Sequence, residues 1–186
     1  LADAVAPHAL YPLDVDRAFA SLDRIRAHVL VWWQESKAPI ELVAAGLAGM
    51  ASAWYARLWQ LDMINTVRVQ WFGGMLTADA WVVPKGAPNA DIAMDFINFA
   101  TRAVPSANFA RLVPYGPVNK DAFGFLRADR AAVLPSTATN KAVQFVQNWN
   151  YWADNRQALT DRFEDWFLTE PEEQGSPAGG DTGVED

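Results

Sequence analysis

The sequence predicts an α/β fold, because segments with helical spacing of apolar residues alternate with short apolar runs that suit buried strands. The chain has 186 residues, of which 51% are hydrophobic, so wholesale disorder is excluded and a core can form. It contains no cysteine, which excludes a disulfide framework, a thiolate metal site and a cysteine nucleophile.

The clearest helix follows Pro12, with Asp14 as the expected N-cap and apolar residues at helical spacing as far as Val29. Asn89 is expected to cap a second helix, and a long third helix is expected over residues 152–169. Shorter helical segments are expected at residues 1–6, 40–48, 105–113, 120–126 and 140–146.

Four short apolar runs are predicted as strands, at residues 29–33, 49–54, 67–71 and 79–84. The last run begins with an acid, Asp79. A carboxylate beside a buried strand costs on the order of several kcal/mol unless a cation or hydrogen-bond donors meet it. Two explanations have equal weight: Asp79 binds a cationic group, or it caps backbone N–H groups at the start of the strand.

The net charge of −7 comes mainly from one end of the chain. Residues 170–186 hold six of the 22 acidic residues and no Lys or Arg, which leaves 16 acidic and 15 basic residues elsewhere. No basic stripe indicates a nucleic-acid partner. The composition of residues 170–186 predicts a disordered acidic tail.

The sequence shows no arrangement of residues that is typical of a catalytic site. The two histidines, His8 and His28, are far apart, and no phosphate-binding or nucleophile motif occurs. The sequence therefore predicts neither an enzyme, nor a metal site, nor a cofactor. Nine tryptophans are many for this length. Trp54 is expected to end a strand, Tyr115 to lie in a Pro/Gly turn, and Trp152 to begin the last helix. Each alone suits packing, but aromatics at such places together with an acid describe a pocket for a cation.

Five segments, taken in order, resemble the C-terminal half of bacterial extracellular solute-binding proteins of the spermidine/putrescine type, the capture subunits of ABC importers. The segments are LYPLDVDRAFASLDRIRAHVLVWW, MASAWYARL, DAWVVPKGAPN, LVPYGPVNK and WADNRQALTDRFEDWFL. The resemblance extends from Leu1 to about Thr169.

This resemblance implies a periplasmic-binding-protein-like type II fold, in which two α/β lobes close on a ligand about a hinge. Residues 1–77 would be the first part of the C-terminal lobe, with its start missing. Residues 78–123 would cross back to the N-terminal lobe, residues 124–169 would return with the final helix, and residues 170–186 would be the tail.

The resemblance also implies a site in which carboxylates hold ammonium groups and aromatic rings cover the methylene chain. Trp54, Asp79 and Tyr115 match family positions of this kind. Thr77 stands where polyamine binders can carry an aromatic residue. Trp152 adjoins the place of a ligand-contacting glutamine, which is alanine here.

The implied function is therefore capture of a small cationic or polyamine-like solute in the periplasm or another extracytoplasmic space, and its delivery to a membrane permease. No signal peptide is present in this sequence. An alternative is an incomplete or split-gene fragment that binds ligand only with a separate N-terminal lobe. In that case an apolar face would lie uncovered, formed by Trp81, Val83, Phe96, Ile97 and Phe99.

Overall fold

The computed structural model describes residues 5–169. The described residues form two compact units, one of residues 5–11 and 30–147 and the other of residues 12–29 and 148–169. The predicted tail, and most of the helix end predicted at residues 1–6, lie outside the described residues. Residues 5 and 6 are not helical. The predicted boundaries at residues 77 and 123 are not tested by this division and stay predictions.

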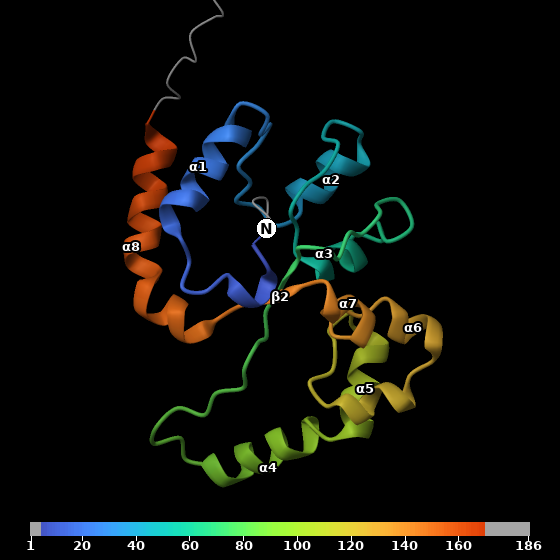
Figure 1. Cartoon of the computed structure of the whole chain (residues 1–186). Helices are drawn as coiled ribbons and strands as arrows, with labels where there is room; N and C mark the ends of the chain where they lie inside the picture. The colour runs from blue at the N-terminus through green and yellow to red at the C-terminus, as the bar shows by residue number, and fades with distance from the viewer. Residues whose placement is uncertain (1–4, 170–186) are drawn as a thin grey trace, which may run out of the picture. The chain divides into compact units, whose positions relative to one another are not determined.

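The larger unit consists of short helices and one two-stranded sheet (Figure 1). Its elements in chain order are η1 (Pro7–Ala9), α2 (Ala38–Ala44), α3 (Tyr55–Gln60), β1 (Met75–Leu76), α4 (Ala90–Ala100), α5 (Ala103–Leu112), η2 (Lys120–Phe125), α6 (Ala128–Ala132), α7 (Ala138–Ala142) and β2 (Phe145–Val146).

The two strands of this unit pair in parallel, with Met75 opposite Phe145. Three further backbone bonds extend the ladder, including one from Gly73 N to Val143 O at 2.9 Å. The strands predicted at residues 29–33, 49–54, 67–71 and 79–84 are wrong, because none of these runs is paired in the described residues. The helix predicted over residues 140–146 is correct only at its start, since α7 ends before β2 pairs with β1.

A small core holds the larger unit together. Its buried hydrophobic residues are Ile40, Leu58, Ala107, Ala110, Ala122 and Leu134. Two buried amides add a polar layer: Asn140 donates to Ala132 O and Leu134 O, and Gln144 donates to Pro135 O and Asn140 O, all at 2.9 Å. Because these donors are satisfied, their burial fixes the connection between α6 and β2 at little cost.

The helix predictions are largely confirmed, because caps and helical spacing are local properties. Asp14 caps its helix by accepting a bond from Arg17 N at 3.0 Å. The helix predicted after Asn89 is present as α4, although the Asn89 side chain makes no capping bond. The helix α3 was not predicted, and Trp54, expected to end a strand, is its N-cap residue.

The smaller unit pairs α1 (Val15–Arg26) with α8 (Trp149–Leu168) (Figure 1). Trp166 of α8 packs edge-on against Phe19 of α1, with ring centroids 6.0 Å apart, and its Nε1 donates to Asp23 at 2.6 Å. The Arg26 guanidinium lies 4.4 Å from the centre of the same indole. Arg162 adds an ion pair with Asp16 at 2.7 Å. Aromatic and polar contacts thus fix the register of the two helices.

We expect Trp166→Phe to destabilise the α1–α8 pair by about 1 kcal/mol, because a smaller aromatic ring takes the place of the indole and the indole N–H bond to a carboxylate is lost. Hydrogen exchange of the α8 amides measures this change. Trp149→Phe is the matched control, since Trp149 is 53% exposed at the start of the same helix. Equal effects of the two substitutions would contradict the role given to the Trp166–Asp23 bond.

Candidate binding site

Asp79 lies three residues beyond β1 on a stretch without regular secondary structure, and its side chain is exposed. Neither the hydrogen bonds nor the ion pairs within residues 5–169 include its carboxylate. The capping explanation therefore fails in this structure, because no backbone N–H group is bonded to Asp79. The carboxylate is left open to a cationic or hydrogen-bonding group from outside the described chain.

Trp54 is half-exposed, at 51%, and precedes the first turn of α3. The next residue, Tyr55, is anchored: its hydroxyl donates to Val133 O at 2.5 Å, and Trp59 Nε1 donates to that hydroxyl at 3.0 Å. The Tyr55 ring also packs against Trp71, with centroids 4.8 Å apart. These contacts fix the start of α3, and with it the backbone that carries Trp54.

Burial raises the pKa of the Tyr55 phenol, while the Trp59 hydrogen bond and the charge of Arg130 act in the opposite direction. The net increase keeps the phenol protonated at neutral pH. Tyr55 can therefore remain the donor to Val133 O throughout the physiological range.

Tyr115 is also half-exposed, at 49%, and stacks on Phe109 with ring centroids 6.3 Å apart. It lies in a bend between two buried prolines, Pro114 and Pro117. The neighbouring Gly116 packs directly on Ser136, whose hydroxyl donates to Pro117 O at 3.0 Å. The contacts with Ser136 thus hold the bend that carries Tyr115 in place.

Arg130 connects the part of the chain that carries Trp54 with the part that carries Tyr115. Its guanidinium lies 4.1 Å from the centre of the Trp59 ring in α3. The same side chain donates to Ala110 O and Val113 O, both at 2.8 Å, at the end of α5. Neither Tyr55 nor Arg130 was predicted from the sequence as part of the site, because their partners are distant in sequence.

We expect Arg130→Gln to lower the free energy of unfolding by about 1.5 kcal/mol, because two part-buried carbonyls lose a charged donor. Urea denaturation measures the loss. Arg127→Gln is the control: Arg127 forms an ion pair with Asp129 at 3.0 Å that is fully exposed, so solvent screens the pair and its loss should change stability little. A larger loss in Arg127→Gln than in Arg130→Gln would refute this account of Arg130.

The two remaining residues predicted to bind ligand, Thr77 and Trp152, have fewer contacts that fix their side chains. Thr77 is half-buried directly after β1, and none of the hydrogen bonds among the described residues involves it. Trp152 is half-buried in the first turns of α8, where its ring meets Tyr151 at 6.4 Å. Trp152 belongs to the smaller unit and the other four predicted residues to the larger one.

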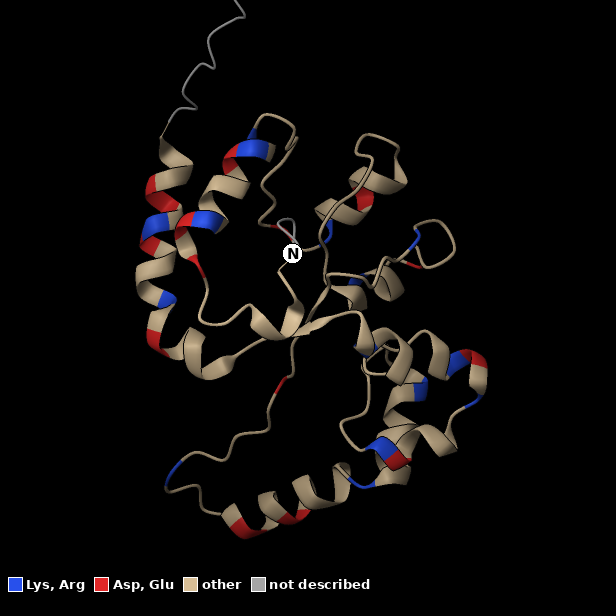
Figure 2. Cartoon of the chain, viewed as in Figure 1, with Lys and Arg blue, Asp and Glu red and all other residues tan. Residues whose placement is uncertain are grey.

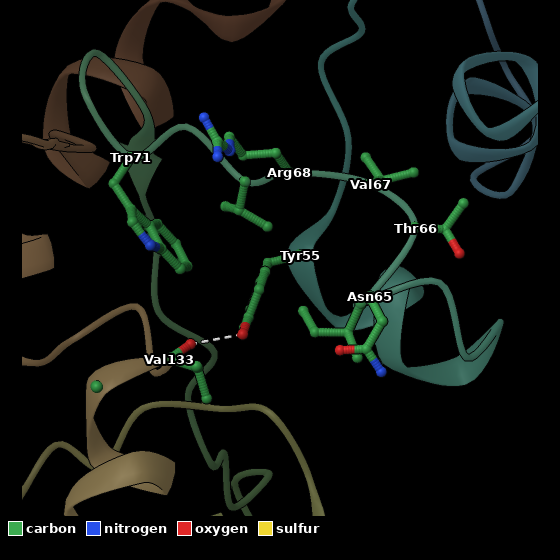
Figure 3. A pocket seen from close by; sticks show the side chains of 10 residues that line it. Tyr55, Asn65, Thr66, Val67, Arg68, Trp71 and Val133 are labelled. Carbon is green, nitrogen blue, oxygen red and sulfur yellow. Dashed lines mark hydrogen bonds between the residues drawn. The ribbon is translucent and has the colours of Figure 1, made fainter. Parts of the chain in front are cut away.

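A pocket of about 520 Å³ adjoins Tyr55 in the larger unit (Figure 3). Figure 3 shows the Tyr55 hydroxyl directed at Val133 O, with Trp71 and Asn65 on opposite sides of the ring. The ten residues that line the pocket are Tyr55, Ile64, Asn65, Thr66, Val67, Arg68, Val69, Trp71, Ala132 and Val133. The pocket includes none of the residues predicted as ligand-binding, so its formation does not test them.

Charged residues are distributed differently among the helices. Figure 2 shows acidic and basic positions interspersed along α1 and α8, whereas α4 carries acidic positions only. The described residues include no group of three or more metal-ligating side chains. Across residues 5–169, no helix is both long enough and apolar enough to cross a membrane.

Comparison with known proteins identifies the class. Residues 1–131 match the family described as bacterial extracellular solute-binding protein, and the chain belongs to this family. One relative is the γ-aminobutyric acid-binding protein of Pseudomonas aeruginosa PAO1. It is 31% identical over 172 residues, which cover 89% of this chain and 49% of the relative.

Two solved structures are similar over most of the chain. One is an ABC transporter substrate-binding protein from Bradyrhizobium japonicum USDA 110, with a TM-score of 0.76, 34% identity and coverage of 89% of this chain and 52% of that one. The other is AgtB from A. tumefaciens R10 in complex with agropinic acid, with a TM-score of 0.69, 35% identity and coverage of 90% and 53%.

These similarities confirm the predicted fold class, part of a periplasmic-binding-protein-like type II fold. The named relatives are binding proteins of transporters or of small solutes, which confirms the prediction of a binding protein rather than an enzyme. The chain spans about half the length of the relatives it matches.

Proposed function

We propose that this chain is part of the substrate-binding component of an ABC importer, outside the cytoplasm, that captures a small solute with a cationic nitrogen. The polyamine-like class, with putrescine and spermidine as its simplest members, is the specific form of the proposal. The observation that carries it is Asp79, an exposed carboxylate that forms no hydrogen bond or ion pair within residues 5–169.

The proposed chemistry needs an anion and apolar surface close together. A carboxylate attracts an alkylammonium group by charge-assisted hydrogen bonding, and aromatic faces cover the attached methylene groups. Trp54 and Tyr115 expose about half of their surface on fixed backbone. Thr77 is a further candidate in the larger unit, and Trp152, in the smaller unit, stays a prediction. Closure of two lobes on the solute would produce the form that a membrane permease recognises.

The relatives support a nitrogen-bearing solute and widen its class. γ-Aminobutyric acid, named in one relative, carries an amino group and a carboxylic acid, and the AgtB structure holds agropinic acid. A ligand with one amino and one acid end would still present its ammonium to Asp79. A polyamine would need a second anion at its other end.

Calorimetric titration with four probes tests the proposal: putrescine, spermidine, γ-aminobutyric acid and butyrate. Binding of putrescine or spermidine supports the polyamine form. Binding of γ-aminobutyric acid alone supports the cationic nitrogen and rejects the polyamine form. Binding of butyrate alone, or of none of the amines, rejects the proposed function.

A second candidate is that ligand capture needs a separate N-terminal lobe. The observation that favours it is the half-length match to every relative described above. On this proposal residues 1–77 and 124–169 form one lobe and residues 78–123 contribute to the other. The titrations are therefore made with this chain alone and with the chain joined to the part of the family fold that it does not span.

A further inference from the structure

The pocket beside Tyr55 is a second place where this chain can hold a small molecule. Its volume of about 520 Å³ lies in the range that is typical of small-molecule sites. None of the residues predicted to bind ligand lines this pocket, and the ten residues that line it all belong to the larger unit. The pocket is therefore a different site from the one that Asp79 would form, and it has its own chemistry.

The pocket has walls whose positions are fixed by contacts within the chain. The Tyr55 ring packs against Trp71 with centroids 4.8 Å apart, and the Tyr55 hydroxyl donates to Val133 O at 2.5 Å. The segment that carries most of the lining is held at its start by a bond from Val67 N to Met63 O at 3.0 Å. Because these contacts join three parts of the larger unit, the pocket is largely formed before a ligand binds.

Arg68 is the one charged residue among the ten that line the pocket within residues 5–169, and none of the ten is acidic. Arg68 is exposed, and no hydrogen bond, ion pair or ring contact among the described residues involves its guanidinium. Figure 3 shows Arg68 and Val133 on opposite sides of the Tyr55 ring. An anionic group is the partner that this cation lacks.

The rest of the lining combines a few polar groups with a larger apolar surface. Asn65 and Thr66 add an amide and a hydroxyl, both of which can donate hydrogen bonds. The apolar lining residues are Ile64, Val67, Val69, Trp71, Ala132 and Val133. One cation balances one negative charge, and the apolar surface suits a hydrocarbon body. Inorganic phosphate is a poorer match, because it is more highly charged and has no apolar surface.

We propose that the pocket lined by Tyr55, Arg68 and Trp71 binds a small monocarboxylate with an apolar body. The carboxylate pairs with the Arg68 guanidinium, and the body lies against the Tyr55 and Trp71 rings. Arginine suits this role because its planar fork of N–H donors matches a carboxylate. The inference goes beyond the proposed function, because such a ligand has no ammonium group and needs no contact with Asp79.

The test uses the full chain, with benzoate as the probe and benzamide as its neutral counterpart of similar shape. Two-dimensional heteronuclear NMR follows the indole N–H of Trp71 and the backbone amide of Arg68. We expect benzoate to shift both signals with a Kd on the order of 1 mM or tighter, as a small ligand with one charged contact allows. Benzamide should bind at least about tenfold more weakly, because it cannot form an ion pair with the guanidinium.

Arg68→Gln should weaken benzoate binding at least about tenfold and leave the fold unchanged, because Arg68 is exposed. Lys85→Gln is the matched control: Lys85 is an exposed cation of the larger unit outside the pocket, and its loss should change the affinity by less than about twofold. Asp79→Asn should likewise leave the benzoate affinity within about twofold. Arg68→Glu should reverse the preference, so that benzylamine rather than benzoate shifts the Trp71 signal.

Any of four results would overturn the carboxylate site. They are no shift of either signal at saturating benzoate, whether or not inorganic phosphate gives one; equal affinity for benzoate and benzamide; equal losses in Arg68→Gln and Lys85→Gln; and displacement of benzoate by putrescine, which would make the two sites one. A chain that binds benzoate as expected and none of the amines would count against the proposed function alone.

Discussion

Asp79→Asn is expected to weaken binding of a cationic solute about 50-fold, or about 2.3 kcal/mol, the size of one charge-assisted hydrogen bond. The substitution keeps the size of the side chain and removes its charge. Asp79 is exposed and makes no internal bond among residues 5–169, so the fold should be unaffected. Calorimetric titration with the tightest-binding amine of the probe set measures the loss.

Asp91→Asn is the control for this substitution. Asp91 is an exposed acid in the first turn of α4, and its removal changes the net charge by the same amount. The Asp91→Asn variant should bind the cationic solute with an affinity within about twofold of that of the unsubstituted chain, because long-range attraction between exposed charges is screened by salt. Similar losses in the two variants would mean that overall charge, rather than a contact with Asp79, attracts the solute.

Gly116→Ala is expected to lower the free energy of unfolding by about 3 kcal/mol, because an added Cβ overlaps tightly packed atoms. That Cβ would lie 2.8 Å from Ser136 N, a backbone atom, and also against the side chain of the same serine. The bend would have to move, and Tyr115 with it, so solute binding should weaken as well. Urea denaturation and titration measure the two effects.

Gly124→Ala is the control, because a Cβ at Gly124 in η2 meets nothing within 4 Å. It should be neutral or slightly stabilising, since alanine reduces the freedom of the unfolded chain. Ser136→Gly in the Gly116→Ala background should restore part of the stability by removing the clashing side chain. If the double variant does not recover stability, the strain caused by Gly116→Ala does not come from the Ser136 side chain.

The helices could be predicted because their signals are local. Asp14 caps α1 through Arg17 N, and the periodic apolar residues of α4 and α8 lie within single segments. The strand predictions failed because a strand exists only with a partner. The run at residues 80–83 has strand-forming side chains but no partner within residues 5–169.

The exposed members of the candidate site could be predicted, whereas their supports could not. Asp79, Trp54 and Tyr115 were selected by residue type and by family resemblance, and the structure leaves all three exposed. Tyr55 and Arg130 make their contacts with carbonyl groups far along the chain, 78 residues away for Tyr55 and Val133. Backbone carbonyls carry no sequence signal, so no pattern indicates such a bond.

The most direct test of the central claim is a crystal structure of this chain, joined to the part of the family fold that it does not span, with the tightest-binding amine. The account predicts the cationic nitrogen within about 3 Å of an Asp79 carboxylate oxygen, with Trp54 or Tyr115 against the adjoining methylene groups. A bound amine whose nitrogen is held by other groups, with Asp79 still facing solvent, would contradict it.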